Sequence, residues 1–326
     1  MKILITGAAG FIGFHIASKC LESNYVVTGI DNLNDYYDVN LKLSRLKILN
    51  ENSNFTFHKL DLENHREITS LLNDQLFDVV IHMGAQAGIR YSIDNPFKYL
   101  RSNIEGTLNL FEGLKDLNCK HFIFASTSSV YGANTDLPFK EDDKSDSPIQ
   151  FYAVTKKTCE LMGHSYSNMY KIPVTGLRFF TVYGPWGRPD MALMKFTEKI
   201  CKGELIEIYN SGNHLRDFTY IDDVVESIFL LINNPPQIDE KNLVPYRVLN
   251  IGNSKPENIL DYVKEIEINL NVKAKKIMKP HQPGDILNTY SSSEELYKIT
   301  GFKPKVSIKE GVKKFIEWYR HYNNLK

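Results

Sequence analysis

Two short motifs in this chain could do chemistry together, and the first is Tyr152-Ala-Val-Thr-Lys156. A spacing of four residues places the phenol and the ammonium on one face of a helix. A nearby positive charge favours the phenolate, so the pair is typical of proton transfer. The same spacing also occurs where Tyr and Lys only pack on a helix surface. The hydroxyl-rich segment Ser126-Thr-Ser-Ser-Val-Tyr-Gly132 favours the chemical interpretation, because Thr127 could bridge the phenol and a substrate oxygen.

The second motif is a glycine turn, Gly7-Ala-Ala-Gly10-Phe-Ile-Gly13, directly after the apolar run Lys2-Ile-Leu-Ile-Thr6. A buried strand, a glycine turn and an amphipathic helix form the first half of a dinucleotide-binding unit. Glycines let the backbone approach a pyrophosphate, and the helix N-terminus supplies free N–H groups and a positive dipole. A plain strand-to-helix turn is the alternative for the motif alone. Both motifs together predict a nucleotide cofactor held against a proton-transfer group.

The next predicted strand, Tyr25-Val-Val-Thr-Gly-Ile30, ends at Asp31. A carboxylate at this point accepts hydrogen bonds from the adenosine ribose of a dinucleotide. It would repel a 2′-phosphate, so the sequence favours NAD over NADP. The alternative is that Asp31 only caps the loop that follows.

Apolar runs alternate with helical patterns, which predicts an α/β fold with a doubly wound parallel sheet, the Rossmann fold. We expect an NAD-binding domain at residues 1–180 with a return at about 221–252, and a smaller, discontinuous α/β substrate domain mainly at 181–326. Further predicted strands are 55–60, 77–82, 121–125 and 174–179, and the clearest helices are 104–114 and 152–170.

Composition excludes several classes of function. The chain has 39 basic and 39 acidic residues, so no electrostatic argument favours nucleic acid or an anionic membrane. The first strand begins at residue 2 and no apolar run could span a bilayer, so we expect no signal peptide and a cytoplasmic location. The four cysteines are scattered without metal-ligand spacing, which predicts incidental thiols and no metal site.

With these motifs, the chain resembles the extended short-chain dehydrogenase/reductase family over nearly its whole length, and within it the NAD-dependent nucleotide-sugar epimerases. Further matching segments are Asp61-Leu62, His82-Met-Gly-Ala-Gln-Ala-Gly-Ile-Arg-Tyr91 and Asn103. The resemblance implies that Tyr152 is the catalytic base, that Lys156 binds the nicotinamide ribose, and that Thr127 assists the tyrosine. A homodimer formed by helices 104–114 and 152–170 is implied as well. The implied NAD-binding residues are Gly7, Gly10, Phe11, Ile12, Gly13, Asp31, Asn32, Asp61, Leu62, Gly84, Ala85, Gln86, Asn103, Ala125, Tyr152, Lys156 and Phe179.

Three stretches resemble UDP-glucuronate 4-epimerases in particular: 31–38, 87–92 and, above all, 177–192. The segment 212–223 resembles the diphosphate signature of the family. This resemblance implies interconversion of UDP-glucuronate and UDP-galacturonate at C4 through a 4-keto intermediate, with NAD retained by the enzyme. Arg188 could also act only as a loop anchor. The implied substrate-binding residues are Arg90, Thr127, Ser128, Ser129, Tyr152, Thr181, Arg188, Arg216 and Asp285.

Ser128 and Ser129 argue against dehydratases and decarboxylases of the same superfamily, which carry acidic residues after the threonine. Gln282 and Thr181 stand where UDP-galactose epimerases typically have Arg and Asn. Two alternatives stay open. Within the enzyme class, the substrate is another UDP-hexose, neutral, N-acetylated or N-acetyl-uronic. Outside it, the chain is a non-catalytic NAD-binding regulator, although such proteins usually lack the Tyr or the Lys.

Overall fold

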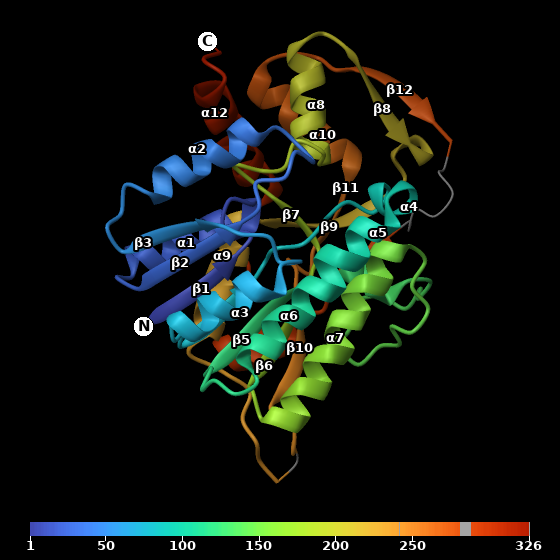
Figure 1. Ribbon diagram of the computed structural model, residues 1–326. Helices are drawn as coiled ribbons and strands as arrows, with labels where there is room; N and C mark the ends of the chain where they lie inside the picture. The colour runs from blue at the N-terminus through green and yellow to red at the C-terminus, as the bar shows by residue number, and fades with distance from the viewer. Residues whose placement is uncertain (241, 281–287, 326) are drawn as a thin grey trace.

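A seven-stranded parallel sheet forms the larger lobe of this protein in a computed structural model that describes residues 1–240, 242–280 and 288–325 (Figure 1). The strand order is β10-β6-β5-β4-β1-β2-β3, so the direction of winding reverses between β1 and β4. A doubly wound sheet binds its ligand at such a reversal, beyond the carboxyl ends of the strands. The strands are β1 (Lys2–Thr6), β2 (Val26–Asp31), β3 (Phe55–Lys59), β4 (Val79–His82), β5 (His121–Thr127), β6 (Val174–Phe179) and β10 (Tyr246–Ile251).

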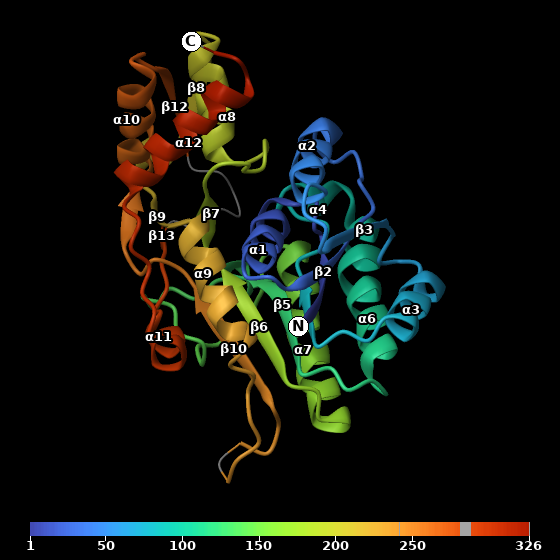
Figure 2. The same ribbon diagram turned by 90° about the vertical axis from the view of Figure 1, so that its left-hand side faces the viewer.

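Helices cover both faces of this sheet, as Figures 1 and 2 show. One face carries α1 (Phe11–Glu22), α2 (Val39–Leu49) and α9 (Ile221–Ile232), and the other carries α3 (His65–Asp74), α6 (Gly106–Leu114) and α7 (Phe151–Tyr170). Successive side chains of a strand point to opposite faces. Ile3 and Ile5 of β1 therefore join the apolar cluster under α1, whereas Leu4 joins the cluster under α3 and α6. The sheet is buried on both faces, which explains the continuous apolar runs of the sequence.

A smaller lobe lies beyond the carboxyl ends of the strands (Figure 1). In it β9 (Leu215–Tyr220) pairs with β7 (Thr181–Tyr183), β11 (Pro256–Asn258) and β13 (Asn288–Thr289), and β8 (Leu205–Tyr209) pairs with β12 (Lys275–Lys279). The helices of this lobe are α8 (Ala192–Cys201), α10 (Ile259–Leu270) and α12 (Ile308–Tyr322). The helix α11 (Glu294–Thr300) instead contacts α9 and β10 of the larger lobe.

Several element boundaries differ from those predicted from the sequence. The helical region before α6 begins much earlier than residue 104, with α4 (Tyr91–Asp94), α5 (Pro96–Tyr99) and the π-helical turn η1 (Leu100–Glu105). Pro96 suits the first turn of a helix, where no N–H is needed. β5 runs two residues beyond Ala125, to Thr127, because β6 continues to pair with it. β4 begins at Val79, not Phe77, and β3 ends at Lys59.

Within the described ranges, none of the helices has the length and apolar character that a bilayer span requires. The same part of the chain contains no group of three or more His, Cys, Asp or Glu side chains arranged to hold a metal ion. Its four cysteines are all unpaired thiols, and three of them are buried.

Candidate active site

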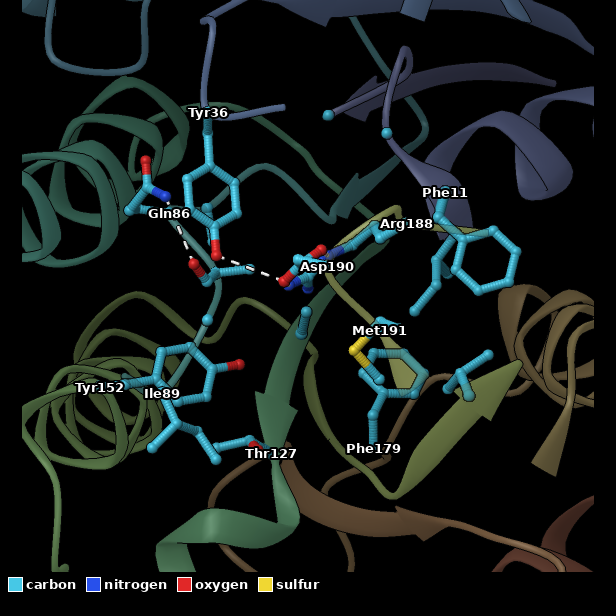
Figure 3. Close-up of a pocket in the computed structure, with 18 of the residues that line it drawn as sticks. Phe11, Tyr36, Gln86, Ile89, Thr127, Tyr152, Phe179, Arg188, Asp190 and Met191 are labelled. Carbon is cyan, nitrogen blue, oxygen red and sulfur yellow. Dashed lines mark hydrogen bonds and ion pairs between the residues drawn. The ribbon is translucent and has the colours of Figure 1, made fainter. Parts of the chain in front are cut away.

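A cavity of about 940 Å³ lies between the two lobes, at the carboxyl ends of the strands (Figure 3). Its wall is formed by the glycine turn, the loops after β2, β4 and β5, the start of α7, and parts of α8, β8 and β9. All but two of the residues singled out in the sequence line it: Gly7, Gly10, Phe11, Ile12, Gly13, Asp31, Asn32, Asp61, Leu62, Gly84, Ala85, Gln86, Arg90, Ala125, Thr127, Ser128, Ser129, Tyr152, Lys156, Phe179, Thr181, Arg188 and Arg216. The two exceptions among these predicted binding residues are Asn103, which does not line the cavity, and Asp285, which lies outside the described residues. Gln282, which the sequence analysis used to discriminate between substrates, also lies outside the described residues.

The glycine turn is packed so closely that side chains are excluded. Gly7 has a φ of +69°, and a Cβ there would lie 2.7 Å from the backbone nitrogen of Gly84. A Cβ on Gly13 would lie 2.2 Å from the carbonyl oxygen of Gly7. Gly10 precedes α1, and no side chain caps the first N–H groups of that helix. These N–H groups lie at the cavity wall, where they can bind a ligand. This cradle fits a pyrophosphate, because backbone N–H groups and the helix dipole both favour an anion.

The loop after β2 carries polar groups at one end of the cavity. Asp31 accepts a hydrogen bond from the Leu33 N–H at 2.8 Å, and Asn32 donates to Asp61 at 2.9 Å. Asp31 therefore does cap its loop, as the alternative interpretation holds, and it lines the cavity as well. Lys42 of α2 lies beside Asp31, at 3.7 Å between the Lys42 Nζ and Asp31 Oδ1 atoms. The sequence analysis did not single out this lysine.

Tyr152 projects from the first turn of α7, and its phenol points into the cavity near Thr127 (Figure 3). Burial raises the pKa of Tyr152, while the positive charge of Arg188 and a hydrogen bond with Thr127 act to lower it. The Lys156 ammonium donates to the Ala125 carbonyl at 2.8 Å, and burial lowers its own pKa. The expectation that Lys156 also lowers the pKa of the phenol stays a prediction.

A buried ion pair holds the end of β5 against α7. Glu160 of α7 accepts two hydrogen bonds from Arg178 of β6, at 2.8 and 2.9 Å, and a third from the Ser126 hydroxyl at 2.7 Å. The Arg178 guanidinium also lies over the Tyr131 ring, 4.8 Å from its centroid. Since Ser126 directly precedes Thr127, this network fixes the backbone that presents the hydroxyl cluster.

That hydroxyl cluster begins where β5 ends. The Thr127 hydroxyl donates to Ser129 Oγ at 3.2 Å and accepts from the Ser129 N–H, also at 3.2 Å. Ser128 begins the short 3₁₀ helix Ser128–Tyr131. Thr181 starts β7, which follows β6 after a single residue. Together they supply hydroxyl groups, and no carboxylate, from adjacent strand ends to one wall of the cavity.

Arg188 and Asp190 meet Tyr36 inside the cavity (Figure 3). The Arg188 Nε atom donates to Asp190 Oδ1 at 2.9 Å, and a second bond joins its terminal nitrogen to Oδ2. Tyr36 donates to the same carboxylate at 3.2 Å. Burial opposes ionisation of Asp190, but Arg188 holds its pKa below the ordinary value. Sequence reasoning gave no role to Tyr36 or Asp190, although each lies in a segment that resembles the epimerases.

Arg45 of α2 explains how the Arg188 loop is placed relative to the glycine turn. Its side chain is fully buried and donates to the Ala9 carbonyl at 2.7 Å and to the Trp186 carbonyl at 2.6 Å. A third bond reaches the Tyr37 hydroxyl at 2.8 Å. One guanidinium thereby joins the cofactor end of the cavity to the loop that carries Arg188.

Asn103 does not line the cavity, and its expected contact with the cofactor stays a prediction. Its amide oxygen accepts from the Gln86 N–H at 2.7 Å, and its nitrogen donates to the Gln86 carbonyl at 3.1 Å. A further bond reaches Thr155 at 3.0 Å. Asn103 lies in the π-helical turn η1, and such turns are frequent at functional sites. Asn103 thus lies behind Gln86 and fixes the loop that lines the cavity.

The far end of the cavity is basic. Arg90 lies over the Tyr209 ring, 5.7 Å from its centroid, and Arg216 of β9 lines the same region. Two lysines of α8, Lys195 and Lys199, join them in the lining. Their spacing of four residues on an amphipathic helix is a signal that the sequence analysis did not use. Cations at this end suit the phosphates of a nucleotide.

The fold and the cavity define a class: an α/β protein that holds a dinucleotide against a tyrosine on a helix. The chain matches the sequence model of the NAD dependent epimerase/dehydratase family over residues 3–252, and it belongs to that family.

Individual relatives are similar over the full length. Protein CapI of Staphylococcus aureus is 48% identical, with 99% of each chain covered. A probable UDP-glucuronate 4-epimerase of Rhizobium meliloti (strain 1021) is 46% identical, covering 98% of this chain and 97% of the relative. A crystal structure of the Bacillus cereus UDP-glucuronic acid 4-epimerase, in complex with UDP-glucuronic acid and NAD, has a TM-score of 0.90 and 34% identity. That match covers 99% of this chain and 100% of the other.

Proposed function

We propose that this protein is a UDP-glucuronate 4-epimerase, which interconverts UDP-glucuronate and UDP-galacturonate with NAD that it retains. One observation carries the proposal: Tyr152, the hydroxyl cluster and Arg188 line the same cavity as the glycine turn. The named relatives in Rhizobium meliloti and Bacillus cereus support it, since one is a probable UDP-glucuronate 4-epimerase and the other was crystallised with UDP-glucuronic acid and NAD.

The chain's own residues provide a base and an orienting group. When bound, NAD supplies a hydride acceptor that later becomes the donor, so that C4 is oxidised and then reduced. Tyr152 removes the proton of the C4 hydroxyl as the hydride leaves, and it returns that proton when the hydride is added to the other face. Thr127, whose hydroxyl hydrogen-bonds with the phenol, would orient the substrate oxygen. Lys156 and the Ala125 carbonyl hold the start of α7 and the end of β5 at a fixed separation.

The carboxylate of the sugar needs donors, because an unpaired buried charge is costly. Ser128, Ser129 and Thr181 supply hydroxyl groups, and Arg188 supplies the nearby cation. A β-keto acid loses CO₂ readily, so the 4-keto stage demands that the carboxylate be held still. The acidic residues that line the cavity in the described part of the chain are Asp31, Asp61, Asp190 and Glu207. None of these follows Thr127, where a base for removing the C5 proton would be needed.

Turnover of purified protein on UDP-sugars tests the proposal. We expect UDP-glucuronate to give a mixture of its two 4-epimers, separated by chromatography, without consumption of added NAD and without a pentose product. UDP-glucose and UDP-N-acetylglucosamine serve as the competing substrates. Epimerisation of a neutral sugar with no turnover of UDP-glucuronate would contradict the assignment. Binding of NAD without any turnover would favour a regulator.

We also propose a homodimer formed by the helices on one face of the larger lobe. Phe97, Ile93 and Leu161 are exposed apolar side chains there, with 71, 69 and 62% of their surface accessible. They lie on α5, α4 and α7, which contact one another. An exposed apolar patch of this kind marks an interaction surface. We expect light scattering to give twice the chain mass, and Leu161→Glu to give a monomer. A wild-type monomer at micromolar concentration would contradict this.

A cytoplasmic location is part of the same proposal. The proposed substrate, a nucleotide sugar, and the cofactor NAD are both soluble molecules. The three buried thiols suit a reducing compartment. Cell fractionation followed by detection of the protein in the soluble fraction would test the location.

A further inference from the structure

Lys42 and Asp31 form a buried pair at the end of the cavity that is formed by the glycine turn and the loop after β2. Asp31 ends β2 and Lys42 lies in the first turns of α2, and both line the cavity. The exposed fractions of their side chains are 5% for Lys42 and 8% for Asp31. A lysine is almost never buried so deeply without a reason, because desolvation disfavours its charge.

The two oxygens of Asp31 have different surroundings. Oδ1 accepts the Leu33 N–H at 2.8 Å and faces the Lys42 ammonium at 3.7 Å. Oδ2 receives no hydrogen bond from any residue of the described ranges, so it is the oxygen left to accept a ribose hydroxyl. Lys42 therefore neutralises Asp31 without using the atom that a ribose needs.

Lys42 has anchors besides Asp31. Its ammonium donates to Asn34 Oδ1 at 3.1 Å and lies over the Tyr37 ring, 5.0 Å from the centroid. Burial lowers the pKa of Lys42, and the charge of Arg45, on the same helix, adds to this lowering. The charges of Asp31 and Asp35 act to raise it. Because Asn34 and Tyr37 are neutral, they would keep the ammonium in place if the Asp31 charge were removed.

We propose that the Lys42 ammonium can bind the 2′-phosphate of a dinucleotide, and that Asp31 prevents this in the wild-type protein by pairing with the ammonium. The preference for NAD then depends on the pair and not on repulsion by Asp31 alone. An ammonium without a carboxylate has a dianionic phosphate as its best partner, since charge-assisted hydrogen bonds are the strongest that it can form. The inference rests on the proposal that this end of the cavity holds the adenosine of the cofactor.

A competition between cofactors tests the inference. The full-length protein is equilibrated with equal concentrations of NAD⁺ and NADP⁺, and the ratio of the two retained after gel filtration is measured by mass spectrometry. Asp31→Asn keeps an acceptor for the Leu33 N–H and removes the charge. We expect the NADP:NAD ratio to rise by about tenfold or more, the effect of one charge-assisted bond.

A second substitution, added to Asp31→Asn, distinguishes attraction of the 2′-phosphate by Lys42 from the mere loss of its repulsion by Asp31. Asp31→Asn/Lys42→Met should lose the increase, whereas Asp31→Asn/Lys47→Met should keep it, because Lys47 is an exposed lysine of the same helix. An equal ratio in the Lys42 and Lys47 double variants would overturn the inference. If the Lys42 double variant does not fold, the salt dependence of Asp31→Asn decides. A ratio that falls with added salt supports the ammonium site, and a ratio independent of salt overturns it.

These outcomes are distinct from those of the proposed function. Wild-type protein that retains NAD but does not turn over UDP-glucuronate would contradict the epimerase assignment and leave the Lys42 experiment intact. Active epimerase whose Asp31→Asn variant gains no NADP would overturn only the present inference.

Discussion

Asp190 holds Arg188 by a two-point ion pair inside the cavity, with 2.9 Å between the Arg188 Nε and Asp190 Oδ1 atoms. Because Tyr36 also donates to this carboxylate, the pair bridges the loop after β2 and the loop after β7. Asp190 thus holds the guanidinium near Tyr152. Because the pair has no net charge, it needs no counter-ion from solvent. A substrate carboxylate has to approach Arg188 beside Asp190, or to replace it.

Arg188→Ala and Thr181→Ala should lower kcat/KM for UDP-glucuronate far more than for UDP-glucose. Each removes a donor to the charged carboxylate, and a lost charge-assisted bond costs about 1.5–3 kcal/mol. We also expect a small amount of 4-ketopentose, because the carboxylate is no longer held away from the alignment for decarboxylation. Arg66→Ala, at an exposed position of α3, is the control. Equal losses on the acidic and neutral sugars, with no decarboxylated product, would favour a neutral substrate.

Tyr152→Phe should lower the rate of epimerisation by roughly two to four decades, which is the contribution of a positioned acid/base group. The protein should stay folded and retain NAD, since the hydroxyl makes no contact that the fold requires. Tyr170→Phe, at the other end of α7, is the matched control. Near wild-type turnover in a folded Tyr152→Phe variant would show that another group is the base.

Arg188→Met should shift the acidic limb of the pH profile, on which activity rises as Tyr152 loses its proton. Arg188 acts to lower the pKa of Tyr152, so its removal should raise that pKa. The phenolate is the active form, and the limb of kcat/KM that reports it should therefore move to higher pH. The measurement is kcat/KM on UDP-glucuronate across the pH range for both proteins. If kcat/KM falls at every pH while the midpoint of the limb stays at the same pH, Arg188 binds the substrate but does not act on the phenol.

Breaking the Glu160–Arg178 pair should strongly destabilise the protein. Arg178→Met leaves the buried Glu160 carboxylate with Lys157, at 3.1 Å, as its remaining cation. The loss of unfolding free energy should approach the ~3–5 kcal/mol that breaking a buried ion pair costs. Replacing both residues with Met should recover much of that loss, because no charge is then left unpaired. Urea unfolding measures each value. Lys202→Met, in an exposed pair with Glu198, should change stability by less than about 1 kcal/mol. Similar losses in the single and double variants would show that packing, not charge, is responsible.

Stability should fall as the pH is lowered from 7 to 5, because His82 and His121 are buried as neutral rings. Burial lowers the pKa of each to about 3, from an ordinary value of 6.5. The unfolded chain therefore binds more protons below pH 6.5, and stability is lost from there downwards. Each group should account for about 2 kcal/mol at pH 5.

Substitutions separate these histidines from the other acid-sensitive groups. His121→Asn should make the dependence of unfolding free energy on pH between 7 and 5 less steep, because the contribution of His121 is removed and that of His82 remains. His65→Asn, at an exposed position, should leave the dependence unchanged. An identical slope in His121→Asn and wild type would contradict the assignment to His121.

The sequence by itself determined the architecture of the larger lobe and the chemical parts of the site. Apolar runs that alternate with helical patterns favour a parallel sheet covered on both faces. The glycine turn could be identified because a backbone that approaches a pyrophosphate excludes a Cβ, so the requirement is local. Tyr152 and Lys156 share a helix face by periodicity alone. Each of these inferences depends on residues that are close in the sequence.

Only the tertiary structure decided which charges act on one another. Arg188 acts on Tyr152, Lys42 lies beside Asp31, and Asn103 hydrogen-bonds to the backbone of Gln86. Each of these relationships joins groups from different elements, and electrostatic energy depends on distances of a few ångströms. Periodicity gives the face of a helix but not the atom that the face meets. The composition of the site was therefore predictable from the sequence, whereas its electrostatics depended on how helices, strands and loops that are distant in the sequence pack together.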